Sequence, residues 1–152
     1  MTNLKRGFTL VEVLIVVVII GILGAISVAV LNAARVKERD AKRVSDIQVI
    51  RLALEQHWLE NASYPSQATD LEIGKNSAVV LTSSGFQASP VGVVYLPSVP
   101  QGPRPNEYYV YNSASPTVGY SLRFTTEGNT VYGASGTYYA HSNGVDTDST
   151  NK

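Results

Sequence analysis

The sequence contains no cysteine and only two histidines among its 152 residues. Without cysteine the chain has no disulfide, and it offers no thiolate to a metal or to a nucleophilic mechanism. Because His57 and His141 are the only histidines, a metal site built from several imidazoles is also excluded. A domain of this size must then be held together by packing and by non-covalent polar contacts.

The chain also lacks an excess of charge of either sign, because 12 basic residues balance 12 acidic ones. Proteins that bind nucleic acid usually have a basic surface, so no specific nucleic-acid partner is predicted. There is no glycine-rich phosphate loop and no nucleophile motif; Ser84-Gly85 and Ser135-Gly136 are typical of turns. We therefore do not expect an enzyme.

What the sequence does contain is one long apolar run near its N-terminus. Every residue from Val13 to Leu31 is apolar or small, and about 20 such residues in a helix cross the ~30 Å hydrocarbon core of a bilayer. Glu12 is the only charged residue between Phe8 and Ala34. A carboxylate in a membrane segment is costly unless it has a partner, so Glu12 is a candidate functional residue.

Three interpretations fit an apolar helix that follows the basic pair Lys5-Arg6. A plain single-pass anchor would keep this pair in the cytoplasm. A secretory signal peptide would be cut near Asn32-Ala33-Ala34, but its apolar core is usually only about 7–15 residues long. The third interpretation is a processed precursor: a resemblance to a known family implies a cut between Gly7 and Phe8, and glycine, which has no Cβ, would leave that bond accessible. Only the third accounts for a Gly-Phe pair just before Glu12.

The stretch from Lys5 to Glu12, KRGFTLVE, resembles the N-terminus of class III prepilins, the precursors of type IV pilins and type II secretion pseudopilins. The resemblance implies that residues 1–7 are a leader held in the cytoplasm by its basic pair. It implies that a prepilin peptidase cuts after Gly7 and N-methylates Phe8. It also implies that Glu12 of an incoming subunit neutralises the Phe8 amine of its neighbour, and such a pair is stronger at low dielectric than in water.

After the apolar run, the spacing becomes that of an amphipathic helix over residues 35–61. Apolar residues recur at steps of three and four, namely Val44, Ile47, Ile50, Leu54 and Trp58. The first turns, Arg35–Arg43, are rich in charge, and we expect a solvated or headgroup-facing collar there rather than a DNA contact. Pro65 disfavours helix at Tyr64, so the helix should end near Asn61.

Residues 62–152 have the features of a β-rich head. Strand-like runs occur at Val93–Leu96, Tyr108–Tyr111, Tyr120–Thr125, Thr130–Tyr132 and Thr137–His141. Glu127-Gly128-Asn129 is a candidate hairpin turn, and residues 66–92 show one short element at 78–81. We predict an α+β, pilin-like fold in which residues 8–34 form a transmembrane assembly helix. Residues 35–61 then pack on a small antiparallel β-sheet head.

Near the C-terminus, Asn143, Asp146 and Asp148 offer the oxygen ligands that Ca²⁺ prefers. The resemblance implies calcium here, because major pseudopilins bind it in an aspartate-containing loop near their C-terminus in place of a disulfide. The spacing is not that of an EF-hand, and a solvated polar tail is the alternative. No other cofactor is expected.

The predicted function is structural: a subunit of a type IV pilus-like filament that serves adhesion, motility or DNA uptake. Its partners would be copies of itself and other pilins, the prepilin peptidase/methyltransferase, an assembly platform and membrane lipids. The precursor would sit in the cytoplasmic membrane, and the mature form in an extracellular or periplasmic filament.

Two alternatives remain. One is a major-type pseudopilin of type II secretion, which Ala41–Pro65 resembles. The other is a membrane-anchored binding protein that does not polymerise.

Overall fold

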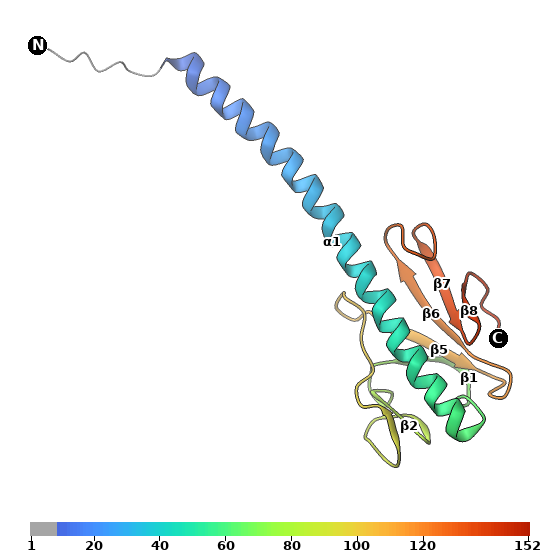
Figure 1. Ribbon diagram of the computed structural model, residues 1–152. Helices are drawn as coiled ribbons and strands as arrows, with labels where there is room; N and C mark the ends of the chain where they lie inside the picture. The colour runs from blue at the N-terminus through green and yellow to red at the C-terminus, as the bar shows by residue number, and fades with distance from the viewer. Residues whose placement is uncertain (1–8) are drawn as a thin grey trace, which may run out of the picture. The chain divides into compact units, whose positions relative to one another are not determined.

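The structure, a computed structural model, describes residues 9–152. Its elements in chain order are α1 (Leu10–Asn61), β1 (Gln67–Ile73), β2 (Val80–Thr82), β3 (Gly85–Gln87), β4 (Val94–Leu96), β5 (Tyr109–Ser113), β6 (Ser121–Thr126), β7 (Gly136–His141) and β8 (Gly144–Asp146) (Figure 1). The chain divides into two compact units, with the boundary between Val36 and Lys37. Each unit is described by itself below.

The first unit contains the apolar part of α1, and every side chain from Leu10 to Arg35 is exposed. The large aliphatic side chains between Val13 and Leu31 are each at least 50% exposed. Exposed apolar area costs roughly 25 cal/mol per Å² in water. The helix is long and apolar enough to cross a membrane, and a bilayer would remove this cost.

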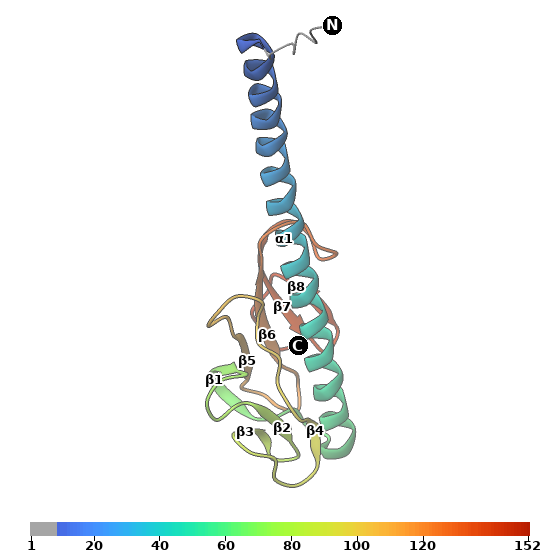
Figure 2. The ribbon, with the colours of Figure 1, turned by 90° about the vertical axis from the view of Figure 1, so that its left-hand side faces the viewer.

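The second unit is built on a five-stranded antiparallel sheet with the order β1-β5-β6-β7-β8. A smaller antiparallel sheet has the order β3-β2-β4. Inward residues alternate along β5, where Tyr109, Tyr111 and Ser113 are buried. The C-terminal half of α1 lies along one side of these strands (Figure 2).

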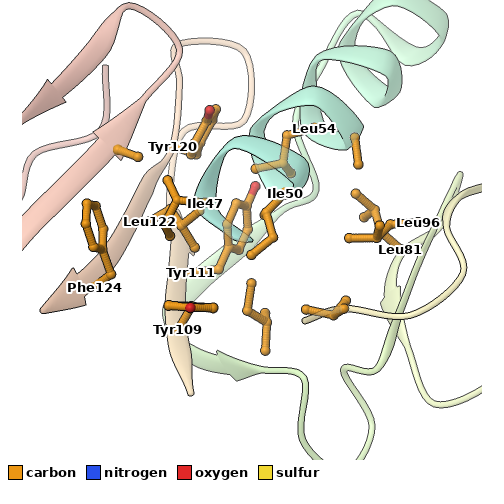
Figure 3. Packing of buried hydrophobic residues seen from close by; sticks show 14 of the residues in the cluster. Ile47, Ile50, Leu54, Leu81, Leu96, Tyr109, Tyr111, Tyr120, Leu122 and Phe124 are labelled. Carbon is orange, nitrogen blue, oxygen red and sulfur yellow. The ribbon is translucent and has the colours of Figure 1, made fainter. Parts of the chain in front are cut away.

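The core of the second unit forms between this half of α1 and the strands. Ile47, Ile50 and Leu54 are fully buried, and their spacing places them on one face of the helix. They point toward aromatic and aliphatic side chains of the sheet (Figure 3), with Tyr109, Tyr111, Tyr120, Leu122 and Phe124 among the members of the same cluster. The spacing of three and four residues between apolar side chains therefore determines which face of α1 packs against the sheet.

The α+β arrangement predicted from the sequence is confirmed. The interpretation of Thr130–Tyr132 as a strand is wrong: these residues belong to the loop between β6 and β7, where Thr130 forms an isolated bridge to Gly133. The sequence signal also misses β1, β3 and β8. Most residues of β1 are exposed and show no clear apolar alternation, and β3 and β8 have only three residues each.

Candidate functional site: the helix start and the charged cluster of the head

Residues Thr9 to Glu12 form a capping box at the start of α1. The backbone N–H of Thr9 donates to Oε2 of Glu12 at 3.4 Å, and the N–H of Glu12 donates to Oγ1 of Thr9 at 3.2 Å. This reciprocal arrangement satisfies two helix N–H groups that have no partner within the helix. The carboxylate therefore has a local partner within its own chain and lies at the helix end that favours negative charge.

The Thr-x-x-Glu spacing of this capping box is a local signal in the sequence, additional to those that predict the helix above. It gives Glu12 a role in helix initiation beside the predicted role in assembly. The predicted leader charges Lys5 and Arg6, and the predicted cleavage and methylation site at Gly7 and Phe8, lie outside the described residues.

The predicted solvated collar is wrong for two of its residues, Asp40 and Arg43, which are only 3% and 2% exposed. The Arg43 guanidinium donates to Oδ1 of Asp40 at 2.7 Å, and through Nε to Oε1 of Glu107 at 2.6 Å. A further nitrogen of Arg43 lies 2.7 Å from Oε1 of Glu127. A buried arginine that meets three carboxylates has its charge compensated and its fork of donors largely satisfied.

Glu127 is the second centre of this charged cluster, which we define as Arg39, Asp40, Arg43, Arg104, Glu107 and Glu127. Arg39 donates to its carboxylate at 2.9 and 2.6 Å, and Arg104 donates to it as well. The hydrogen bond from Arg39, followed by those from Arg43 and Arg104, lowers the pKa of Glu127 to about 2 despite the opposing effect of burial. The cluster has equal numbers of positive and negative groups.

The charged cluster joins α1 to two loops of the head. Asp40 accepts hydrogen bonds from the backbone N–H groups of Glu127 and Gly128 at 3.0 and 2.7 Å. It thereby fixes the turn after β6. Glu107 holds the proline-rich loop before β5 through Arg43. Burial alone would lower the pKa of Arg43, but its hydrogen bonds to Glu107, Glu127 and Asp40 together raise it.

The predicted calcium residues lie at opposite ends of a short strand. Asn143 is in the turn between β7 and β8, whereas Asp146 ends β8 and Asp148 follows it. Both carboxylates contact the ammonium of Lys152, with Nζ–Oδ2 distances of 2.9 Å to Asp146 and 2.7 Å to Asp148. The hydrogen bonds from Lys152 are the main reason that the pKa values of both aspartates lie below their ordinary range.

The two histidines have structural contacts in the head. Nδ1 of His57 lies 2.7 Å from the carbonyl oxygen of Ser63, just after α1. His141 is fully buried, and its Nδ1 lies 2.9 Å from the carbonyl oxygen of Tyr120. Within residues 9–152, no three His, Cys, Asp or Glu side chains are placed to hold a metal ion.

Comparison with known proteins identifies a sequence motif and several relatives. The prokaryotic N-terminal methylation motif matches residues 2–28. The type II secretion system core protein G of Escherichia coli strain K12 is 34% identical over 111 residues, which cover 73% of this chain and 74% of that protein. The protein of the same name from Aeromonas hydrophila is 36% identical over 106 residues, covering 68% of this chain and 71% of the relative.

A third relative, the type II secretion system core protein G of Vibrio cholerae, is 41% identical over 68 residues, or 45% of this chain and 47% of the relative. No solved structure matches the chain. The identity extends well beyond the N-terminal motif, because 111 matched residues are far more than the motif contains. The chain therefore carries a prokaryotic N-terminal methylation motif and belongs to the family of the type II secretion system core protein G.

Proposed function

We propose that this protein is a structural subunit of a type II secretion pseudopilus, made as a prepilin. The observation that carries the proposal is the extent of the identity to core protein G relatives, which runs past the methylation motif into the head. A motif match alone would fit a type IV pilus subunit equally well. The extended identity favours the secretion filament over the pilus.

Processing of the N-terminus would prepare the subunit for assembly. The peptidase would cut after Gly7 and N-methylate Phe8, which leaves a cationic amine next to the start of an apolar helix. The capping box directs the Glu12 carboxylate toward this end of α1. At low dielectric, the Phe8 amine of one subunit and Glu12 of the next would attract each other strongly and set the register between subunits.

The apolar part of α1 supports both anchoring and assembly. Its large side chains are at least 50% exposed from Val13 to Leu31, so the unassembled subunit needs an apolar solvent. The precursor would be anchored in the cytoplasmic membrane. In the filament, the same side chains would pack against helices of neighbouring subunits, and the head would face the periplasm. The partners are then copies of this chain, other pseudopilins, the prepilin peptidase, the assembly platform and lipids.

The proposal is tested by N-terminal mass spectrometry combined with complementation of secretion. The chain is expressed in a type II secreting bacterium that lacks its own core protein G. We expect the mature chain to begin with N-methyl-Phe8 and to restore export of the secreted proteins. The matched variant Gly7→Val, whose branched side chain crowds the scissile bond, should still begin at Met1 and fail to restore export.

Two results would contradict the proposal. A processed chain found in sheared surface pili, with export not restored, would identify a type IV pilus subunit. An unprocessed chain with a stably displayed head would identify a membrane-anchored protein that does not polymerise.

A further inference from the structure

The segment that follows β8 folds back on the head through charged contacts. The Nζ atom of Lys152 lies 2.9 Å from Oδ2 of Asp146 and 2.7 Å from Oδ2 of Asp148. One ammonium thus stands between two carboxylates that are separated by a single residue in sequence. The two negative groups repel each other in this arrangement, and a shared cation offsets that repulsion.

The same two carboxylates also organise the backbone around them. Oδ1 of Asp146 accepts the N–H of Asp148 at 2.8 Å, and Oδ1 of Asp148 accepts the N–H of Thr150 at 3.0 Å. The hydroxyl of Thr150 donates to Oδ2 of Asp148 at 2.9 Å. Each of the four carboxylate oxygens therefore accepts a hydrogen bond from the chain itself. These are successive turns in which an aspartate side chain caps the backbone two residues on.

The segment is also fastened at its far end. The Ser142 hydroxyl donates to the backbone carbonyl oxygen of Lys152 at 2.9 Å. The side-chain amide of Asn151 donates to Oδ1 of Asn112 at 3.3 Å. Ser142 in turn accepts a hydrogen bond at its carbonyl oxygen from Arg51 of α1, at 3.4 Å. The charged contacts of Lys152 therefore close a loop, residues 142–152, that is linked to both the sheet and the helix.

The resemblance to major pseudopilins implies calcium at Asn143, Asp146 and Asp148. The structure does not fit this ion as it stands. Asn143 is at the other end of β8 from Asp146, so the three predicted residues do not converge on one Ca²⁺. The oxygens of the two aspartates are directed at N–H, hydroxyl and ammonium donors of the chain. A divalent ion would have to displace the Lys152 ammonium to reach them.

We infer that the Lys152 ammonium is the resident cation of this loop: it bridges Asp146 and Asp148 and closes residues 142–152 on the head without calcium. The repulsion between the carboxylates of Asp146 and Asp148 can be offset either by this ammonium or by a bound metal ion. The ammonium is covalently attached, so its effective concentration at the site does not depend on calcium in the surroundings. In a chain without cysteine, Lys152 would perform the cross-linking role at this loop.

The inference concerns the head alone and does not depend on whether the filament serves secretion or another purpose. The test is hydrogen exchange of the full-length protein in detergent micelles, measured by mass spectrometry on peptides that cover residues 142–152. Wild type, Lys152→Met and Lys152→Arg are compared, each with excess EGTA and with millimolar CaCl₂. The matched control is Lys75→Met, which removes another partly exposed lysine; its ammonium lies 2.7 Å from the carboxylate of Glu72.

In EGTA we expect Lys152→Met to exchange the amides of this loop roughly threefold to tenfold faster than wild type, as expected for the loss of two partly exposed ion pairs. Calcium should slow the exchange of Lys152→Met, because the two freed carboxylates then share a hard cation, and it should leave wild type unchanged. Lys152→Arg and Lys75→Met should behave like wild type in this loop.

Three results would overturn the inference. If calcium slows exchange in the wild-type loop, then the ion and not the ammonium closes it. If Lys152→Met keeps wild-type exchange in EGTA, the ammonium does not hold the loop. If calcium fails to slow exchange in Lys152→Met, the two carboxylates do not share one cation position, and Lys152 makes only ordinary surface ion pairs.

Discussion

The two halves of α1 share one backbone conformation but differ in what surrounds their side chains. In the first unit, Leu23 is 59% exposed, whereas Leu54 in the second unit is fully buried against the sheet. The sequences differ in the same sense, since apolar residues surround the helix in the first unit but follow a period of three and four in the second. A helix that is apolar all round needs an apolar solvent, and an amphipathic helix needs only one apolar neighbour.

The position of charge also distinguishes the two halves. The first half has one carboxylate, Glu12, with a local partner at the helix end. The second half contributes Arg39, Asp40 and Arg43 to the charged cluster, in which Arg43 is buried among three carboxylates of the same chain. The charges of this cluster are paired within the head, whereas the proposed function requires Glu12 to find its second partner in another subunit. Substitutions in each half should therefore affect different properties.

The largest expected effect is on assembly. Glu12→Gln keeps an acceptor for the capping box but removes the charge, so we expect the subunit to be processed and inserted yet absent from filaments. The matched variant Thr9→Ala loses the cap, at a cost of about 1 kcal/mol to the helix start, and should still be incorporated. The measurement is the amount of each variant in sheared filaments relative to membranes. Equal incorporation of Glu12→Gln and wild type would show that the charge is not needed.

The next effect is on the stability of the head. Arg43→Ala leaves Asp40, Glu107 and Glu127 without their buried partner, and we expect a loss of about 3–5 kcal/mol in the free energy of unfolding. Lys42→Ala is the control, because Lys42 makes a half-exposed pair with Asp46, worth about 0.2–1 kcal/mol. Urea unfolding of the full-length protein in micelles measures both. Similar midpoints for Arg43→Ala and Lys42→Ala would mean that the charged cluster contributes little.

A pair of leucines compares the buried and exposed faces of α1 within the head. Leu54→Ala should lower the free energy of unfolding by about 2–5 kcal/mol, because it leaves a cavity in the core. Leu52 is 65% exposed, and Leu52→Ala should change the free energy of unfolding by less than about 0.5 kcal/mol. Leu23→Ala, in the apolar half, should leave unfolding of the head unchanged. Thermal unfolding in micelles measures all three, and a large effect of Leu52→Ala would reveal a contact that the structure lacks.

The smallest effect is the response of the charged cluster to acid. The pKa of Glu127 is lowered to about 2 in the folded head, mainly by Arg39, while an unfolded glutamate titrates near 4.3. The stability that it contributes is therefore present above a pH of about 4.3, and it is lost as the pH falls toward about 2.

We expect Glu127→Gln to be less stable than wild type at neutral pH and to show a flatter decline between these values. The measurement is the melting temperature as a function of pH. Parallel curves for the two proteins would show that Glu127 does not contribute to acid sensitivity.

Much of the fold could be predicted because its signals are local. The period through Ile47, Ile50 and Leu54 identified the packed helix face, and aromatic runs located β5, β6 and β7 in outline. The capping box of Thr9 and Glu12 is an equally local signal. The charged cluster could not be predicted, because Asp40 and Arg43 meet Glu107 and Glu127 only after the loops have folded onto α1. In the sequence, Asp40 and Arg43 look like residues of any solvated helix surface.

By itself, the sequence determined that this chain has an apolar helix with a single carboxylate near its start, preceded by a glycine and a phenylalanine. It also determined which face of the following helix carries the core. These properties depend on residues that are close together along the chain. The tertiary structure alone decided which charges are buried and that Lys152 meets Asp146 and Asp148. Such pairs depend on the relative positions of strands and loops, which local spacing does not contain.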